Sequence, residues 1–102
     1  MAIKNQVLGS TETSILTATG DSAVVSIMFY NADTATRTVT LYAYPTGGSA
    51  GDGSTIAKFD IPTTDTFLWT GDEKLMLELD GVISAVCDVA SEVTATINYL
   101  NL

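Results

Sequence analysis

The sequence contains no histidine among its 102 residues, and it has a single cysteine, Cys87. Without histidine the chain lacks the commonest general base, the Ser/His/Asp and Cys/His nucleophile arrangements and the commonest zinc ligand. With one cysteine, neither an intrachain disulfide nor a thiolate zinc cluster can form. We therefore expect a protein that is not an enzyme and binds no cofactor, with Cys87 as a small buried residue in "ISAVCDV".

Basic residues are scarce as well: four lysines and arginines stand against 12 acidic residues, which gives a formal net charge of −8. The four, Lys4, Arg37, Lys58 and Lys74, are scattered along the chain. Recognition of phosphate groups and attraction to anionic lipids both need clustered positive charge. We therefore expect neither a nucleic acid nor a membrane as partner.

Long hydrophobic runs are also missing. No apolar stretch approaches the ~20 residues of a membrane-spanning helix, and "MAIKNQVLGS" lacks the apolar core of a signal peptide. Hydrophobic residues nevertheless make up 46% of the chain and charged residues 16%, a balance typical of a folded protein. We expect one domain over residues 1–102, made in a cytoplasm.

What the sequence does contain is alternation with the period of two that is typical of β-strands. The segments are residues 23–31, 36–45, 54–62 and 93–100. Their inward-facing sets are Val25, Ile27 and Phe29; Val39, Leu41 and Ala43; Ala57, Phe59 and Ile61; and Val93, Ala95, Ile97 and Tyr99. In the first segment, Val24 falls with Met28 and Tyr30 on the outward face.

Short strands separated by turn-forming residues at this spacing predict an all-β fold. We expect a single antiparallel β-sandwich, jelly-roll or Ig-like, of about eight short strands. Residues 1–10 fit either the sandwich itself or an extended N-terminal arm.

Residues 70–80 fit two structures. Thr70 and Glu73 have the spacing of a helix capping box, and the "KLMLEL" that follows is rich in helix formers. Its leucines, however, alternate with other residues, which favours a strand because a helix would spread them over more than one face. Asp80-Gly81 then predicts a two-residue hairpin leading into "VISAVCDV".

Any catalysis or metal binding would have to depend on carboxylates. The closest acidic pairs in sequence are Asp72 with Glu73 and Asp60 with Asp65, and we expect both to be solvated. Asp52 alone cannot supply the roughly six to eight oxygens of a calcium site. We predict no catalytic or metal-binding residue; incidental calcium at acidic turns is the alternative.

The stretch "GGSAGDGST", Gly47 to Thr55, is close to a nucleotide-binding P-loop but has Ser54 where the lysine belongs. A P-loop must also open a helix, whose N-terminus helps to bind the phosphates. Here "TIAKFDIP" follows, and it alternates as a strand does. The stretch is therefore predicted to be the loop of a β-hairpin.

Four aromatic residues are the candidate functional residues: Tyr30, Tyr42, Tyr44 and Trp69. The three tyrosines fall on the outward faces of their predicted strands. Such rings either pack on the surface of a sheet or belong to a protein–protein interface, where tyrosine and tryptophan are enriched. Apolar residues on outward faces, among them Val24, Met28 and Val89, favour self-association or docking to a large partner.

Three segments in order resemble small virion structural proteins of tailed bacteriophages, particularly marine and cyanobacterial ones. The segments are "GDSAVVSIMFYN", "TVTLYAYPTGGSAGDGSTI" and "DTFLWTGDEKLMLELDGVISAVCDVASEVTATINYL", so the resemblance covers nearly all of the chain after Gly20. It implies an all-β accessory component of the particle without an active site. Its implied partners are other virion proteins, such as the major capsid protein or neck and tail proteins, and further copies of itself, a trimer among the expected forms.

The expected function is therefore that of a non-enzymatic virion structural protein, most simply a capsid decoration (cement) or head-fibre component. One alternative is a neck, tail or fibre component. Another is a carbohydrate- or receptor-binding β-sandwich module that would use Trp69 or a tyrosine pair to stack on a sugar.

Overall fold

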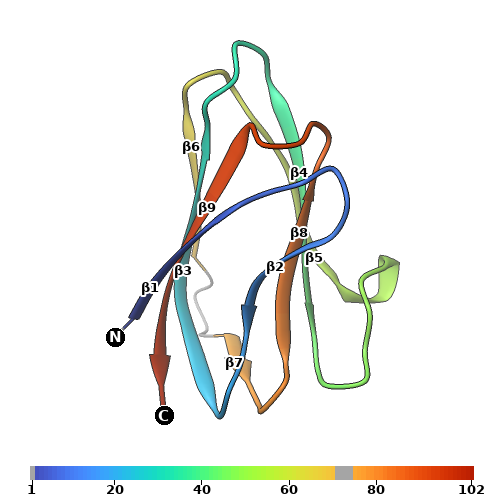
Figure 1. The fold of residues 1–102 in the computed structure, drawn as a ribbon, viewed down its shortest axis with the longest axis vertical. Helices are drawn as coiled ribbons and strands as arrows, with labels where there is room; N and C mark the ends of the chain where they lie inside the picture. Colours follow the sequence, from blue (N-terminus) through green and yellow to red (C-terminus); the bar gives the residue numbers. More distant parts are fainter. Residues whose placement is uncertain (1, 71–74) are drawn as a thin grey trace.

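Two antiparallel β-sheets pack face to face in the computed structural model, which describes residues 2–70 and 75–102 (Figure 1). The five strands of sheet A are β1 (Ala2–Val7), β9 (Val93–Asn101), β3 (Ser22–Asn31), β6 (Thr66–Trp69) and β7 (Leu75–Leu77). The four strands of sheet B are β2 (Thr13–Thr17), β8 (Val82–Cys87), β4 (Arg37–Tyr44) and β5 (Thr55–Ile61). One 3-10 turn, η1 (Asp52–Ser54), precedes β5. The expected all-β sandwich is confirmed.

The strand order follows from rolling up one long antiparallel hairpin. β1 pairs with β9, β2 with β8, and β4 with β5, while β6 and β7 both pair with β3 along the same edge. If β6 and β7 are taken as two pieces of one strand, the chain has eight strands, and each of the first four pairs with its mirror partner in the second four. Rolling this ribbon adds the contacts of β9 with β3 and of β8 with β4. This arrangement is the jelly roll rather than the Ig-like alternative.

The core lies between the sheets and consists of the inward-facing residues of the strands. Ile27, Phe29, Leu41 and Ile97 are fully buried there, as their alternation predicts. The Phe59 ring stacks on that of Phe67, with 4.0 Å between centroids, and lies 5.0 Å from that of Phe29. These contacts join strands from both sheets in one apolar cluster.

A buried asparagine also ties the sheets together. Asn31, at the end of β3, is fully buried, and its Nδ2 donates to the carbonyl oxygens of Ile61 and Ala35, each 2.9 Å away. Its Oδ1 accepts from the Asp33 backbone N–H at 2.9 Å. Because these bonds satisfy the amide, burying it does not leave a polar group unpaired.

The prediction for the start of β3 was wrong by one residue. Val24 was expected to face outward, but it is only 1% exposed, whereas Val25 is partly exposed. The cause is a β-bulge: Val24 pairs with Tyr99 and Ser26 with Asn98, so Val25 is an extra residue without a partner on β9. An extra residue reverses the alternation on one side of it.

The hairpin predicted at Asp80-Gly81 is also wrong, although a turn does occur there. β7 belongs to sheet A and β8 to sheet B, so the two strands do not pair. The Gly81 N–H bonds to the Glu78 carbonyl, and the Asp80 N–H bonds to the Ala18 carbonyl at 2.8 Å. A Cβ at Gly81 would lie 3.0 Å from the Glu78 oxygen, so the close turn favours glycine. The strand alternative holds for Leu75–Leu77, while the capping-box residue Glu73 lies outside the described residues.

The N-terminal residues lie in sheet A rather than in a separate arm. Every residue from Ala2 to Val7 has a partner on β9, from Tyr99 to Thr94. Leu8 is buried, and its N–H bonds to the Val93 carbonyl at 2.9 Å. The first strand is therefore closed onto the last, and both termini lie on the side of sheet A (Figure 1).

Candidate functional site

The register of sheet A decides which of its side chains leave the sandwich, because directly paired residues on adjacent strands point to the same side. Met28 and Tyr30 alternate with buried neighbours and point outward, and Met28 pairs with Leu68 and Thr96. The outward residues of the five strands form what we call the sheet A outer face: Ile3, Asn5, Val7, Ala23, Ser26, Met28, Tyr30, Thr66, Leu68, Met76, Thr94, Thr96, Asn98 and Leu100.

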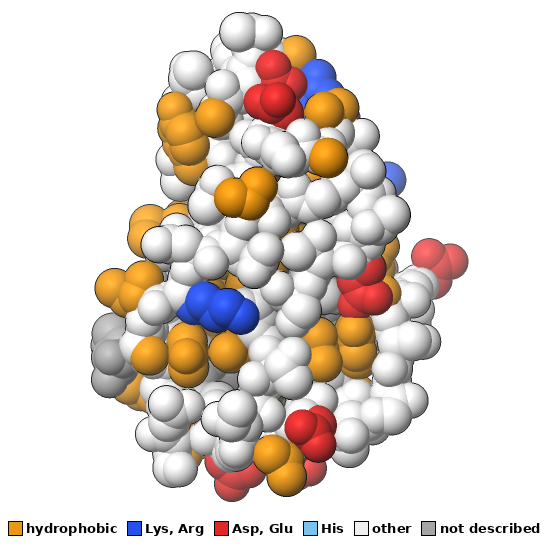
Figure 2. Space-filling view, viewed as in Figure 1, with side chains coloured by type: hydrophobic (Ala, Val, Ile, Leu, Met, Phe, Trp, Pro, Cys, Tyr) orange, Lys and Arg blue, Asp and Glu red, His pale blue; other side chains and the backbone are white. Residues whose placement is uncertain are grey.

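The sheet A outer face combines exposed apolar groups with an absence of charge. None of its residues, over the strands that the structure describes, is acidic or basic. Most of the large hydrophobic side chains that the fold leaves exposed lie on it: Ile3 (68% exposed), Leu68 (54%), Met76 (56%), Val7, Met28 and Tyr30. In Figure 2, hydrophobic side chains line the margin where sheet A lies, and the acidic ones seen there lie at the ends and toward sheet B.

Four of the polar residues of this face bond to one another in two pairs. Thr96 Oγ1 donates to Asn5 Oδ1 at 2.8 Å, and Asn98 Nδ2 donates to Ser26 Oγ at 2.9 Å. Both bonds run across neighbouring strands, between residues that are paired in the register. A polar group that already has a partner within the face loses less when water is removed. The face is therefore suited to burial against another protein surface.

The outward surface of sheet B differs in carrying charge. The exposed Lys58 and Asp60 alternate with the inward-facing residues of β5, and Thr38 Oγ1 donates to Asp60 Oδ1 at 2.7 Å. Glu12, in the β1–β2 connection, lies over the buried Ser84, whose hydroxyl donates to Glu12 Oε2 at 2.6 Å. The Tyr44 hydroxyl donates to the same oxygen.

These bonds shift two acid–base equilibria. The hydrogen bond from Ser84, and then that from Tyr44, lowers the pKa of the Glu12 carboxyl below its ordinary value, against a weaker opposing effect of burial. The bond to Glu12 raises the pKa of the Tyr44 phenol, because only the protonated phenol can donate it, and burial adds to the increase. The cluster fastens the β1–β2 connection to sheet B and leaves Glu12 ionised at neutral pH.

The four predicted aromatic residues do not form one surface. Tyr30 lies on the sheet A outer face and is 46% exposed, whereas Tyr42 and Tyr44 lie partly buried on the opposite side of the molecule, on sheet B. Trp69 pairs with the inward-facing Ile27 and packs against the core. The four therefore do not share one surface of a single copy, and of the four only Tyr30 belongs to the sheet A outer face.

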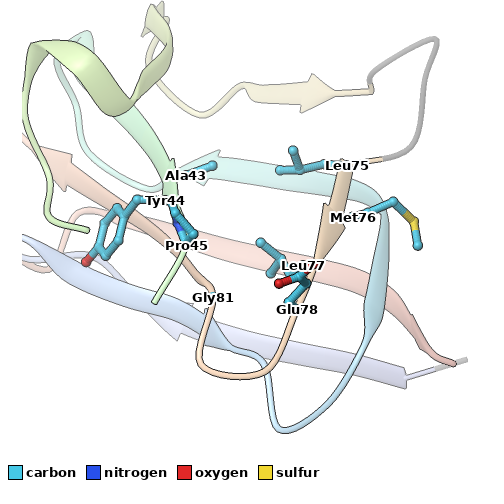
Figure 3. Close-up of a pocket in the computed structure, with 8 residues that line it drawn as sticks. All are labelled: Ala43, Tyr44, Pro45, Leu75, Met76, Leu77, Glu78 and Gly81. Atoms are coloured by element: carbon cyan, nitrogen blue, oxygen red, sulfur yellow. The ribbon is translucent and has the colours of Figure 1, made fainter. Parts of the chain in front are cut away.

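A cavity of about 370 Å³ opens at one end of the sandwich, between the end of β4 and β7 (Figure 3). Leu75 and Leu77 point toward Ala43 and Pro45 across it, while Met76 points away, as its place on the sheet A outer face requires. Among the described residues that line it, Glu78 is the one charged side chain, and Tyr44 is the other residue with an ionisable group.

The loop Gly47–Thr55 is a hairpin connection, as predicted. β4 and β5 pair antiparallel on either side of it, and a strand, not a helix, follows Ser54. The Ser54 hydroxyl is used within the loop: it accepts from the Gly51 N–H at 3.0 Å and lies 2.9 Å from the Ser49 carbonyl, to which it donates. Gly47 has a φ of 81°, which favours glycine. The loop also lines a second cavity, of about 370 Å³, beside Tyr44.

The remaining chemical candidates do not assemble. Within residues 2–70 and 75–102, no three acidic or cysteine side chains come close enough to hold a metal ion. Asp60 lies on β5 and Asp65 in the turn after it, while the pair Asp72 and Glu73 lies outside the described residues, as does Lys74. Cys87 is buried, as expected, and burial raises the pKa of its thiol. In the same ranges no helix has the length and apolar character to cross a membrane.

The chain matches no protein-family model, and no curated protein is similar to it in sequence. No relative indicates a function, so the sheet A outer face is the structural feature that bears on it. Sequence reasoning identified Met28 and Tyr30 as outward apolar residues but not Ile3, Val7 or Leu68. Their signal was alternation in β1 and β6, which are short and were not assigned as strands.

Proposed function

We propose that this protein is a non-enzymatic structural component of a bacteriophage particle that assembles through the sheet A outer face. Within the particle we assign it to capsid decoration or to a head fibre. A place in the neck or tail is the alternative. The protein would be made in the cytoplasm of the host and would reside in the virion.

The observation that carries the proposal is the uncharged, apolar character of the sheet A outer face over its described strands. Contiguous exposed apolar surface on a folded domain marks a binding surface. Depletion of charge is the feature that distinguishes the centre of protein–protein interfaces. In a chain of net charge −8, a five-stranded sheet without a described charged residue on its outer side is a strong departure from the average surface.

The virion setting is supported by two further points. The ordered segments of the chain resemble small structural proteins of tailed phages, from "GDSAVVSIMFYN" through to the last strand. In addition, the jelly roll is a fold that viral capsid domains use. A fold alone does not define a function, so the resemblance and the apolar face are what favour a structural role over a lectin-like one.

Quantitative mass spectrometry of gradient-purified particles tests the proposal. We expect the chain to co-migrate with the major capsid protein, in a fixed ratio to it from one preparation to the next. A copy number comparable to that of the shell subunit supports capsid decoration, and a few dozen copies or fewer would move the assignment to the neck, tail or fibres. Absence from particles whose other structural proteins are all detected would overturn the virion role.

A further inference from the structure

We infer that the partner of the sheet A outer face is a second copy of this chain, docked face to face about a two-fold axis. The inference depends on the proposal that this face is an assembly surface, and it identifies the partner that covers the face as another copy of the chain. In the resulting dimer, sheet A of one copy packs on sheet A of the other, as the two sheets of a sandwich do. Such an interface is isologous: each copy uses the same residues.

Charge favours the sheet A outer face over sheet B as the contact between two copies. Each copy has a formal net charge of −8, so two copies repel wherever their carboxylates face each other. Contact through sheet B would bury Glu12, Lys58 and Asp60 of both copies, and each of these charges would have to be desolvated. Contact through the sheet A outer face places no charged side chain of the described strands against another.

The polar groups of the face are also self-complementary. Its polar residues are Ser, Thr, Asn and Tyr, whose hydroxyl and amide groups both donate and accept hydrogen bonds. Two of the possible pairs are already made within one copy, Thr96 with Asn5 and Asn98 with Ser26. A second copy can therefore cover these polar groups without leaving any of them buried in need of a charged partner.

The edges of the sheets are poorly suited to the competing arrangement, in which strands of two copies pair side by side. On β1, Lys4 pairs with Ile97 and so points to the inner side of the sheet, and an inward-pointing charge on an edge strand opposes further pairing. The opposite edge of sheet A is divided between β6 and β7. β2 and β5, the edges of sheet B, each contain a register shift. The broad face is left as the surface for self-association.

The area of the face reaches the size at which specific interfaces begin. At about 3.3 Å per residue and about 4.8 Å between strands, a sheet of these strand lengths covers on the order of 500 Å² before side-chain relief is counted. Two such faces together bury on the order of 1,000 Å², the lower limit for a specific interface. The projecting side chains of Ile3, Leu68 and Met76 increase this area.

Sedimentation velocity on the full chain and two matched lysine variants tests the inference. Met28 lies near the centre of the face, between Leu68 and Thr96, and Ile56 lies on β5 of sheet B; both are 39% exposed. The wild type, of 10.7 kDa per chain, should sediment as a dimer with a dissociation constant of about 10 μM or tighter. Met28→Lys should weaken the dimer at least about tenfold and Ile56→Lys no more than about twofold. Met28→Leu should keep the dimer, and urea unfolding should find all three variants folded.

The outcomes separate this inference from the proposed function. A wild type that stays monomeric at several hundred micromolar overturns the second copy as partner, whether or not the chain is found in particles. Equal loss of the dimer in Met28→Lys and Ile56→Lys, or in neither, overturns the assignment to this face. A dimer weakened by Met28→Lys alone upholds the inference, even for a chain that proves absent from particles.

Discussion

The outer sides of the two sheets are built from the same type of strand but present opposite surfaces. On sheet A, two pairs of polar residues bond to each other, and Met28, Tyr30 and Leu68 are exposed without a charge among them. On sheet B, Lys58 and Asp60 are exposed, and Glu12 binds the hydroxyls of Ser84 and Tyr44. The difference shows how a small acidic domain can keep a charged, hydrated surface on one sheet while the other sheet presents a surface suited to contact with another protein.

The largest expected effect separates the inside of sheet A from its outside, using neighbouring aromatic residues of β3. Phe29→Ala removes a fully buried ring that lies 5.0 Å from Phe59 and should lower the free energy of unfolding by about 3–5 kcal/mol. Tyr30→Ala removes a 46% exposed ring and should change it by about 1 kcal/mol or less, while weakening self-association. Urea unfolding and sedimentation measure the two quantities. A loss for Tyr30→Ala as large as that for Phe29→Ala would show that the outer face stabilises the monomer and is not kept for contact.

A second, smaller effect should be confined to sheet B. Glu12→Ala leaves the buried Ser84 hydroxyl without its acceptor, so the free energy of unfolding at neutral pH should fall by about 1 kcal/mol. Solvent around the exposed carboxylate keeps the effect at this low level. The dimer should be unaffected, and Asp52→Ala, which removes an exposed acid from η1, should change neither quantity.

The same contribution should depend on pH in a defined direction. The Glu12 pKa is lowered from 4.5 by folding, so its stabilising effect is complete above pH 4.5 and is lost as the pH falls through the lower folded-state pKa. The Tyr44 pKa is raised from 10.0, so its effect is present below pH 10 and is lost at higher pH. Urea unfolding of the wild type and Glu12→Ala across this range should show a constant gap from pH 5 to 9 that narrows at both ends. A gap that widens toward low pH would contradict the hydrogen-bonded cluster.

A further prediction distinguishes the face from the edge. Lys4→Thr removes the inward-pointing charge of β1 and should add slow, concentration-dependent growth of larger species to the dimer, with the free energy of unfolding changed by less than about 0.5 kcal/mol. Lys58→Thr changes the net charge equally but alters a residue that points outward from β5, and it should not produce this growth. Light scattering over time compares the two variants; identical growth would assign the effect to net charge alone.

The last prediction is that completing the P-loop pattern in the loop Gly47–Thr55 has no effect on nucleotide binding. Ser54→Lys completes the P-loop pattern in sequence, but β5 begins at the next residue, so no helix N-terminus is present to bind a phosphate. Equilibrium dialysis with ATP should detect no binding by this variant or by the wild type. Measurable affinity that requires the lysine would contradict the interpretation of the loop as a hairpin connection.

How much of the fold could be predicted from the sequence depended on whether the alternation of inward and outward residues was long and unbroken. In β4, β5 and β9 the period of two correctly placed residues such as Leu41, Phe59 and Ile97 in the core. In β3 it failed at Val24, because a bulge leaves no mark in the order of apolar and polar residues. The Asp80-Gly81 turn was found, but its backbone bonds lead the chain to the other sheet, which a local pattern does not specify.

The candidate site was predicted only in part, for a related reason. Sequence alternation indicates that Tyr30 and Tyr42 point outward from their strands, but not that they do so from opposite sheets. The sheet A outer face depends on β1, β9, β3 and β6 lying next to one another, although they come from both ends and the middle of the chain. That neighbourhood is a property of the rolled topology and has no counterpart in any single segment.

The pairing of the first strand with the last also has a consequence for the order of events during folding. β1 has its ladder partner in β9, which begins at Val93, so sheet A cannot close until nearly the whole chain has been synthesised. The pairs of β2 with β8 and of β3 with β9 are likewise distant in sequence, and folds dominated by such contacts form slowly, in milliseconds to seconds. Among the described strands, β4 and β5 are consecutive in the chain and pair with each other through the loop at Gly47–Thr55, so this hairpin can form early. The glycine-rich loop therefore lies where the ribbon folds back on itself. From this hairpin, the remaining strand pairs can form in order toward both termini.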